Sequence, residues 1–302
     1  MKKKLLLIGG GVIATHYKDG LIGSPNFRLV ALADINPSCA ARSLLDVPFY
    51  TDYVDALAIG IDVALISTST STHYDIASDL LDRGIDVITE KPMCVSYDKI
   101  VELFELAKHK NAHLGCIFHW MYADEVLFVK QHLTDFGKIT SITVNICDDY
   151  AATADGSIDI TRRGLCGAWL DSGINVLSYI SQLIDVSNYT LVREDHELDP
   201  STNQQKYAHR NYLFGKVTAD ITIDWRTPSR DKTSQIVCER GVIDINHSQQ
   251  TVSLNGKVIY SNPLDDRLGG HYVNTFCDYR LDGAQRKRTL LLHKILFEGG
   301  VS

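Results

Sequence analysis

Three kinds of feature are scarce in this sequence, and each absence narrows what the protein can be. Its seven cysteines are scattered, odd in number and never spaced Cys-x-x-Cys, which argues against a disulfide framework and a cysteine metal site. No segment approaches the ~18 to 20 uninterrupted apolar residues of a membrane span. A net charge of -7 supplies no basic surface for phosphate backbones or anionic membranes. We therefore expect a cytoplasmic protein with no metal, nucleic-acid or membrane partner.

The first residues imitate a secretory signal, because the basic Met1–Lys4 precedes an apolar stretch that reaches Ala14. Three consecutive glycines, Gly9–Gly11, interrupt that stretch, and no A-x-A cleavage site follows it. We therefore expect no signal peptide and interpret the segment as part of the fold.

The chain has enough apolar residues for a sizeable core, and its 302 residues favour two domains. In residues 1–120, apolar strand-like runs alternate with amphipathic helical ones, which predicts a Rossmann-type, doubly wound parallel sheet. We expect strands near residues 3–8, 28–33, 62–67, 85–89 and 112–117. We expect helices that begin at Asn36–Pro37, at Ser71 or Thr72 with an end at Gly84, and at Ser96 with an end near Lys110.

Residues 121–302 show alternating strands instead, which predicts an α+β domain with a large open, mainly antiparallel sheet. Asn255–Gly256 is a strong hairpin signal within it. One face of such a sheet, uncovered by helices, would leave apolar area for a homodimer or homotetramer to bury. We expect strands at 139–146, 189–194, 216–225, 233–245 and 250–260, and helices at 167–184, 272–280 and 289–297.

The segment after the first expected strand, Gly9–Ala14, satisfies the pattern G-x-G-x-x-A. In a dinucleotide site, Gly9 would make the tight turn and Gly11 would let the pyrophosphate approach the backbone. The N–H groups of Val12 and Ile13 would then face the phosphates at a helix start. The motif lies between a strand and a helix, so we predict a nucleotide site.

Asp34 ends the second expected strand, 20 residues after Ala14. Its carboxylate can accept hydrogen bonds from two ribose hydroxyls and would repel a 2′-phosphate. Ile35 and Asn36 add no cation, so NAD is expected rather than NADP. Arg42 lies close enough in sequence to soften that preference.

Two further segments carry a family resemblance. Thr89-Glu90-Lys91-Pro92 ends the strand at 85–89, and a polar loop from Ser67 and Thr68 leads to His73 at a helix start. Together with the glycine motif, their order and spacing resemble the Gfo/Idh/MocA oxidoreductases. The resemblance implies that Lys91 contacts substrate and cofactor, that Pro92 follows a cis bond, and that the C-terminal domain is an open antiparallel sheet. It implies cofactor contacts from Gly9, Gly11, Val12, Ile13, Asp34, Ser67, Thr68, His73, Glu90 and Lys91.

A second signature covers Gly167–Asn175, where this family usually shows G-x-L-x-D-x-G-x-H. Asp171 and Asn175 are four residues apart and would share one helix face. Asn175 stands where most members have histidine, so a proton must be accepted elsewhere.

The pattern D-x-G-I-N-x-L-S resembles bacterial aldose 1-dehydrogenases that act on galactose or arabinose. His119 after the last Rossmann strand and Asp224-Trp225-Arg226 at a strand end agree with that subgroup. This resemblance implies an NAD(P)-dependent oxidation of an aldose to an aldonolactone. The implied catalytic residues are Lys91, Asp171, Asn175 and His119, and the implied substrate contacts are Lys91, His119, Asp171, Asn175, Trp225 and Arg226.

Two alternatives stay open. The substrate could be an inositol, another polyol or a sugar phosphate, for which Arg162–Arg163 is the candidate phosphate-binding pair. The chain could instead be an NAD-bound sugar sensor without catalysis, which the replacement at Asn175 leaves possible.

Overall fold

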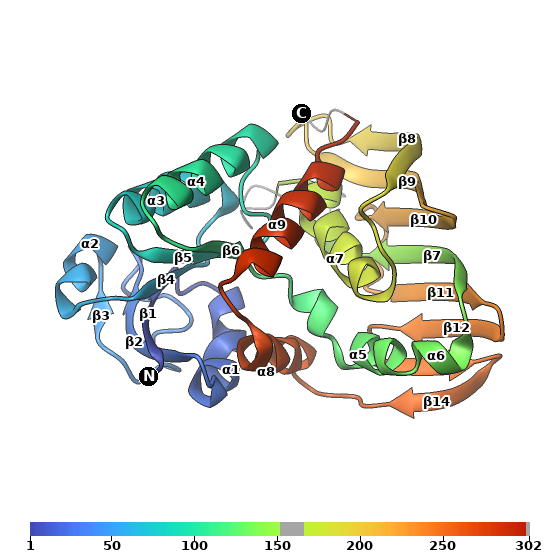
Figure 1. The fold of residues 1–302 in the computed structure, drawn as a ribbon, viewed down its shortest axis with the longest axis horizontal. Coiled ribbons are helices and arrows are strands. Elements are labelled where there is room, and N and C mark those ends of the chain that lie inside the picture. The colour runs from blue at the N-terminus through green and yellow to red at the C-terminus, as the bar shows by residue number, and fades with distance from the viewer. Residues whose placement is uncertain (152–165, 300–302) are drawn as a thin grey trace. The chain divides into compact units, whose positions relative to one another are not determined.

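The computed structural model describes residues 1–151 and 166–299, which fall into two compact units (Figure 1). One unit comprises Met1–His119 and Leu268–His293. The other comprises Trp120–Arg267 and the residues from Lys294 onward. In the described stretches, no helix is long and apolar enough to cross a membrane.

The first unit contains a six-stranded parallel sheet in the order β3-β2-β1-β4-β5-β6. The order reverses between β1 and β4, which is where doubly wound sheets bind their ligands at the carboxyl ends of the strands. The strands are β1 (Lys3–Ile8), β2 (Phe27–Ala33), β3 (Phe49–Tyr50), β4 (Val63–Ile66), β5 (Asp86–Thr89) and β6 (Leu114–Cys116). The predicted Rossmann architecture is confirmed. Only the two-residue β3 was not predicted, because it is too short to show a period.

Helices pack around this sheet. On one face, Leu5, Leu7 and Leu65 of the strands share a core with Tyr17 and Tyr272. The helices are α1 (Lys18–Gly23), α2 (Tyr53–Ala56), α3 (Thr70–Asp82), α4 (Tyr97–His109), α8 (Arg267–Asp278) and α9 (Gly283–Leu296). A 3-10 turn, Ile13–Tyr17, precedes the short α1, so the helix expected after the glycine motif consists of two short segments.

The helix predicted from Asn36–Pro37 is wrong. Residues 37–44 form turns instead. The Asn36 side chain accepts a hydrogen bond from the Ser38 N–H at 2.9 Å, and the Ala41 N–H donates to the Gly10 carbonyl at 2.9 Å. These bonds replace those a helix would need, because the segment is fastened to the glycine loop.

The second unit contains an eight-stranded sheet in the order β14-β13-β12-β11-β7-β10-β9-β8. All neighbours are antiparallel except β7 and β10, which confirms a mainly antiparallel sheet. Asn255 and Gly256 both have positive φ, 50° and 80°, as a type I′ hairpin turn requires. The strands are β7 (Ile139–Cys147), β8 (Tyr189–Leu198), β9 (Gln205–Phe214), β10 (Val217–Asp224), β11 (Lys232–Cys238), β12 (Gly241–Asn246), β13 (Thr251–Leu254) and β14 (Lys257–Ser261).

Figure 1 shows α5 (Asp124–Gln131), α6 (Leu133–Phe136) and α7 (Ile174–Leu183) on one face of this sheet. A π-helical turn, Trp169–Gly173, leads into α7. The other face does not have the expected apolar surface at its centre. Alternate residues there are polar and at least partly exposed, and exposed apolar side chains occur near the edges of the sheet. The central polar residues include Thr143, Asn145, Thr222 and Gln235.

Candidate active site

Four predicted site residues each directly follow a strand of the parallel sheet. Gly9 follows β1, Asp34 follows β2, Ser67 follows β4 and Glu90 follows β5. Because these strands are parallel and adjacent, the four residues share the carboxyl edge of the sheet.

The glycine loop has open space beside Gly11 and is tightly packed at Gly9. Gly9 has φ +97°, and a Cβ there would lie 2.7 Å from the Ser67 carbonyl carbon. A Cβ on Gly11 would meet no protein atom within 4 Å. Val12 beside it is 76% exposed. The loop therefore fits a pyrophosphate, which needs a tight first turn and an uncovered backbone at the third residue of the motif.

The Asp34 carboxylate is oriented by two backbone donors, the Gly10 N–H at 2.6 Å and the Asn36 N–H at 2.7 Å. An ionised carboxylate offers about four acceptor sites, so capacity remains for ribose hydroxyls. Ile35, which follows it, is 91% exposed. The Arg42 guanidinium donates to the Pro37 carbonyl and lies 4.3 Å from the centre of the Phe49 ring. The residues present fit NAD.

His73 joins two loops of this edge and is buried. Its Nε2 lies 3.0 Å from the Thr68 carbonyl oxygen, and its Nδ1 lies 3.2 Å from the Pro92 carbonyl oxygen. Burial lowers the pKa of His73. A neutral imidazole has a single N–H, so it donates to one of the two carbonyls at a time. The Ser67 hydroxyl donates to the Gly9 carbonyl at 2.7 Å, which connects the same loop to the glycine turn.

Glu90 is buried, and its Oε1 accepts hydrogen bonds from the hydroxyls of Tyr17 and Tyr272, both at 2.7 Å. Its Oε2 accepts from the Lys91 backbone N–H at 3.1 Å. The Lys91–Pro92 peptide bond is cis, as the family resemblance implied. Neither tyrosine was predicted as a site residue. Only Tyr17 had a local signal, its place just after the glycine motif.

His119 is buried and its Nδ1 lies 3.1 Å from Nδ1 of His271 on α8. The two rings stack with centres 5.4 Å apart, and Tyr272 lies at the same distance from His119. One imidazole must donate and the other accept, so the two rings hold complementary tautomers.

In the second unit, the structure brings Asp171 and Asn175 together. The Asn175 Nδ2 donates to the Asp171 carbonyl at 3.4 Å, and the Asn175 side chain is only 9% exposed. The Asn175 Oδ1 has no hydrogen-bond partner within residues 1–151 and 166–299. Arg162 and Arg163 lie outside the described residues.

Sequence reasoning missed three charged residues of the second unit, Asp148, Lys232 and Arg267. Asp148 directly follows β7, is buried and pairs with Lys232. Burial raises the pKa of Asp148, and the neighbouring charge of Asp171 raises it further. Burial lowers the pKa of Arg267, which faces Glu125 and Asp148. Each stands in a short charged run that forms no recognisable motif, so no local pattern identified it.

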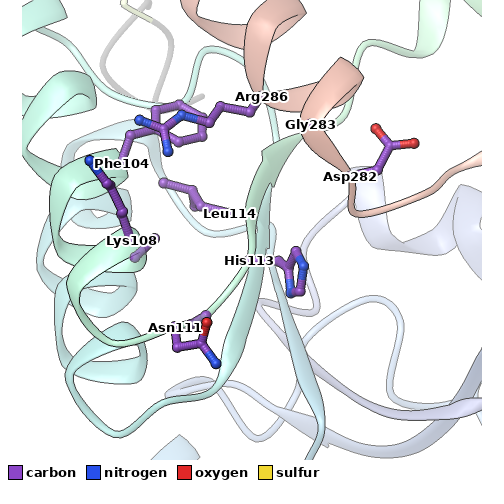
Figure 2. Close-up of a pocket in the computed structure, with 10 residues that line it drawn as sticks. Phe104, Lys108, Asn111, His113, Leu114, Asp282, Gly283 and Arg286 are labelled. Atoms are coloured by element: carbon purple, nitrogen blue, oxygen red, sulfur yellow. The ribbon is translucent and has the colours of Figure 1, made fainter.

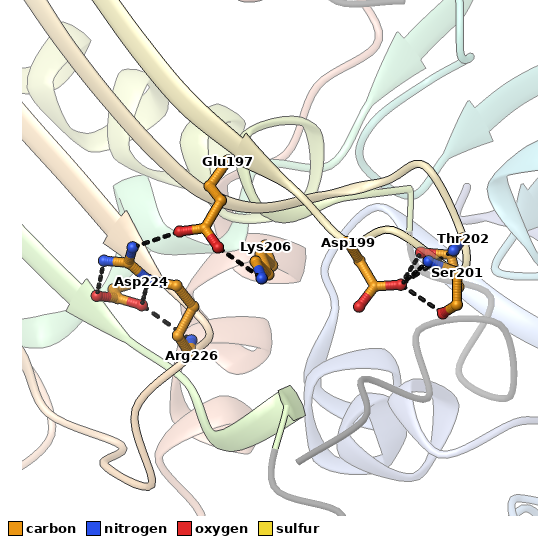
Figure 3. Close-up of polar contacts among 7 residues, drawn as sticks. All are labelled: Glu197, Asp199, Ser201, Thr202, Lys206, Asp224 and Arg226. Atoms are coloured by element: carbon orange, nitrogen blue, oxygen red, sulfur yellow. Dashed lines mark hydrogen bonds and ion pairs between the residues drawn. The ribbon is translucent and has the colours of Figure 1, made fainter.

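In the Asp224-Trp225-Arg226 segment, the Trp225 side chain lies in the core and the Arg226 side chain lies at the surface. Trp225 is fully buried, with Tyr150 edge-on to its ring at 4.8 Å. Arg226 is exposed and makes a two-bond contact with Asp224 at 2.7 and 2.9 Å (Figure 3). Its third contact, with Glu197 at 2.7 Å, extends the network to Lys206. The structure therefore places Arg226 in a surface ion-pair network.

A pocket of about 220 Å³ opens elsewhere in the first unit, where α4 ends, β6 begins and α9 begins (Figure 2). Lys108, His113 and Arg286 line it, and Arg286 pairs with Glu105 at 3.3 Å. It lies at the amino end of β6, so it is distinct from the nucleotide loop.

Comparison with known proteins agrees with this geometry. Residues 3–118 match the profile of Gfo/Idh/MocA, described as an oxidoreductase family with an NAD-binding Rossmann fold. Inositol 2-dehydrogenase of Rhizobium meliloti (strain 1021) is 25% identical over 153 residues, which cover 49% of this chain and 46% of that protein. The first curated relatives are matched over 44 to 66% of their own length.

Solved structures share the fold of almost the whole chain. GenD2 from gentamicin A biosynthesis, in complex with NAD, has a TM-score of 0.77 at 15% identity, covering 98% of this chain and 92% of that one. KijD10, a 3-ketoreductase from Actinomadura kijaniata in complex with TDP-benzene and NADP, has a TM-score of 0.78 at 14% identity, covering 98% and 96%. Residues 3–118 therefore match the NAD-binding Rossmann domain described for the Gfo/Idh/MocA oxidoreductase family.

Proposed function

We propose that this protein is an NAD-dependent oxidoreductase that transfers a hydride between a sugar or polyol hydroxyl and nicotinamide. The favoured substrate is an aldose, oxidised at its anomeric carbon to an aldonolactone. The observation that carries the proposal is the Glu90–Lys91–Pro92 loop at the carboxyl edge of the Rossmann sheet, with its carboxylate fixed by buried donors.

The residues of the first unit would hold the cofactor. Gly11 leaves the space for the pyrophosphate, and Asp34 accepts the ribose hydroxyls. When bound, the nicotinamide supplies the acceptor for the hydride.

Protein side chains must also orient the sugar and accept the proton of its reacting hydroxyl. We assign Lys91 to hydrogen-bond the reacting hydroxyl and Asp171 to accept the proton, directly or through Lys91. Asn175 supports this assignment, because its buried Oδ1 lacks a donor in the described parts of the chain and a sugar hydroxyl would provide one. His119 would bond another hydroxyl of the sugar.

The test compares Lys91→Ala and Asp171→Asn with two matched surface changes, Lys108→Ala and Asp195→Asn. Lys108 is exposed, and the Asp195 side chain is 46% exposed. We expect the site variants to lose ~10²- to 10⁴-fold in kcat, the range that positioned acid and base groups contribute, while NADH binds with little change. Turnover within about tenfold of wild type in both site variants would refute the assignment.

A second candidate function is oxidation of an inositol or another polyol, favoured by the similarity to inositol 2-dehydrogenase. Absorbance at the NADH band, recorded with NAD or NADP and a panel of aldoses, inositols and sugar phosphates, separates the two. Reduction with aldoses and release of a lactone supports the first function, and reduction with inositols only supports the second.

An NAD-bound sensor without catalysis is the alternative of another class. It predicts that no substrate of the panel produces NADH. NADH would still bind, and a sugar would alter the fluorescence of bound NADH. Any turnover with a sugar or polyol removes this alternative.

A further inference from the structure

Glu90 is held by two tyrosines that come from distant parts of the chain. Tyr17 ends the 3-10 turn after the glycine motif, and Tyr272 lies on α8. Both hydroxyls donate to the same carboxylate oxygen, Oε1, at 2.7 Å. Glu90 is 5% exposed and both tyrosines are fully buried, so water does not compete for these bonds.

The two phenols remain donors throughout the working pH range. Burial raises the pKa of Tyr17 and of Tyr272 well above the ordinary value, and the nearby Glu90 charge raises both further. A neutral phenol keeps its O–H, and hydrogen bonds to a charged acceptor are about twice as strong as neutral ones.

Packing fixes both rings. They meet edge to face with centres 4.7 Å apart, and Tyr272 also stacks on Phe276. A Cβ on Gly20 of α1 would lie 2.6 Å from the Tyr272 carbonyl oxygen, so the backbones of α1 and α8 are in close contact. This packing confines both rings, with their hydroxyls directed at Glu90.

We call Tyr17, Tyr272 and the Glu90 carboxylate the clamp. The clamp also contacts the backbone of the candidate catalytic residue Lys91. The second carboxylate oxygen of Glu90 accepts from the Lys91 backbone N–H at 3.1 Å. His271, the neighbour of Tyr272, contacts His119 at 3.1 Å. Consecutive residues of α8 therefore contact both Glu90 and His119.

We propose that Tyr17 and Tyr272 are positioning residues for Lys91, acting through the Glu90 carboxylate. The inference rests on the proposed function for the role of Lys91 in turnover. Its structural content, that loss of either hydroxyl displaces Lys91, can be tested without turnover.

The kinetic test uses Tyr272→Phe and Tyr17→Phe, which remove one hydroxyl and keep the ring. Tyr53→Phe is the matched control, because the Tyr53 hydroxyl also donates to a carboxylate of the first unit, that of Asp79 at 3.1 Å. We expect kcat to fall between about 10- and 100-fold in the two clamp variants, since a small misplacement of a catalytic group can cost about 100-fold. KM, the NADH Kd and the control should change less than about threefold.

A double-mutant cycle separates positioning from general loss of stability. If both tyrosines act through one carboxylate, Tyr17→Phe should add little to the loss already caused by Tyr272→Phe or by Glu90→Gln. Independent, additive losses in kcat would overturn the proposal. So would losses no larger than those of Tyr53→Phe.

A second measurement needs no activity. Reductive ¹³C-methylation keeps the lysine charge, and the Lys91 signal is assigned with Lys91→Arg. We expect Tyr272→Phe and Tyr17→Phe to shift the Lys91 signal and Tyr53→Phe to leave it in place. An unmoved signal in both clamp variants overturns the proposal. If wild type turns over no sugar or polyol, the proposed function fails, and this shift alone decides the positioning role.

Discussion

The Nε2 atom of His293 accepts a hydrogen bond from the Met93 backbone N–H at 3.0 Å. Its Nδ1 lies 2.8 Å from the Thr289 carbonyl, to which it must donate. The ring is therefore neutral, with its proton on Nδ1. It is fully buried, and burial lowers the pKa of His293 to about 4. A neutral histidine thus anchors the segment that follows Pro92.

Because His293 is buried and neutral, we predict that the free energy of unfolding falls in acid. Its pKa is about 4 in the fold and 6.5 in the unfolded chain, so the unfolded chain binds more protons between these values. The stabilisation is complete above about pH 6.5 and is lost as the pH falls towards 4, and it amounts to about 3 kcal/mol. Urea unfolding across this range should show a flatter decline for His293→Gln than for the exposed-site variant His109→Gln. Equal slopes would contradict the prediction.

Gly11→Val should abolish cofactor binding without unfolding the chain. A Cβ at this position meets no protein atom within 4 Å, so the added side chain occupies only the space expected for the pyrophosphate. Gly23→Val is the control, because Gly23 also has open space around its Cβ and ends α1. Titration of NADH fluorescence should give no binding for the first variant and normal binding for the second. Unchanged NADH affinity in Gly11→Val would place the nucleotide elsewhere.

The double change Asp34→Ser with Ile35→Arg should move the preference from NAD towards NADP. It removes the carboxylate that repels a 2′-phosphate and adds a guanidinium at a position that is 91% exposed. We expect the ratio of the two dissociation constants to change on the order of tenfold or more. Ile35→Arg alone retains the carboxylate and should shift the ratio less. Direct calorimetry with NADH and NADPH measures both, and an unaltered ratio would reject the assigned role of Asp34.

Arg210 should stabilise the second unit far more than Arg193 does. Arg210 is buried, pairs with Glu194 at 2.6 Å, donates to the Glu298 carbonyl at 2.8 Å and lies over the Trp169 ring. Removing the Arg210 charge leaves the Glu194 carboxylate without its ion-pair partner. Arg210→Met should therefore lower the free energy of unfolding by about 3 to 5 kcal/mol. The Arg193–Asp195 pair is exposed, and Arg193→Met should cost under about 1 kcal/mol. Denaturant unfolding of both variants checks the difference, and equal costs would contradict it.

Much of the nucleotide edge could be predicted from the sequence because its requirements are local. Gly9 needs a positive φ, Ser96 precedes a helix of 13 residues that ends before Lys110, and apolar runs alternate with helical ones. The same local patterns located the Glu90–Lys91–Pro92 loop after β5. Sequence reasoning failed at β9, where the inward-facing Arg210 interrupts the apolar alternation.

Other features depended on contacts between residues far apart in the chain. Glu90 and Tyr272 are separated by 182 positions, and Met93 and His293 by 200. Asn36–Pro37 carries helix-start signals, yet its segment turns back onto Gly10. The sequence by itself therefore determined the longer strands of the parallel sheet, the glycine turn and the loop that bears Lys91, because backbone sterics and side-chain periodicity act between near neighbours. Only the tertiary structure decided which buried donors fix that loop, because such pairs form when packing brings distant segments together and leaves each buried polar group to find a partner.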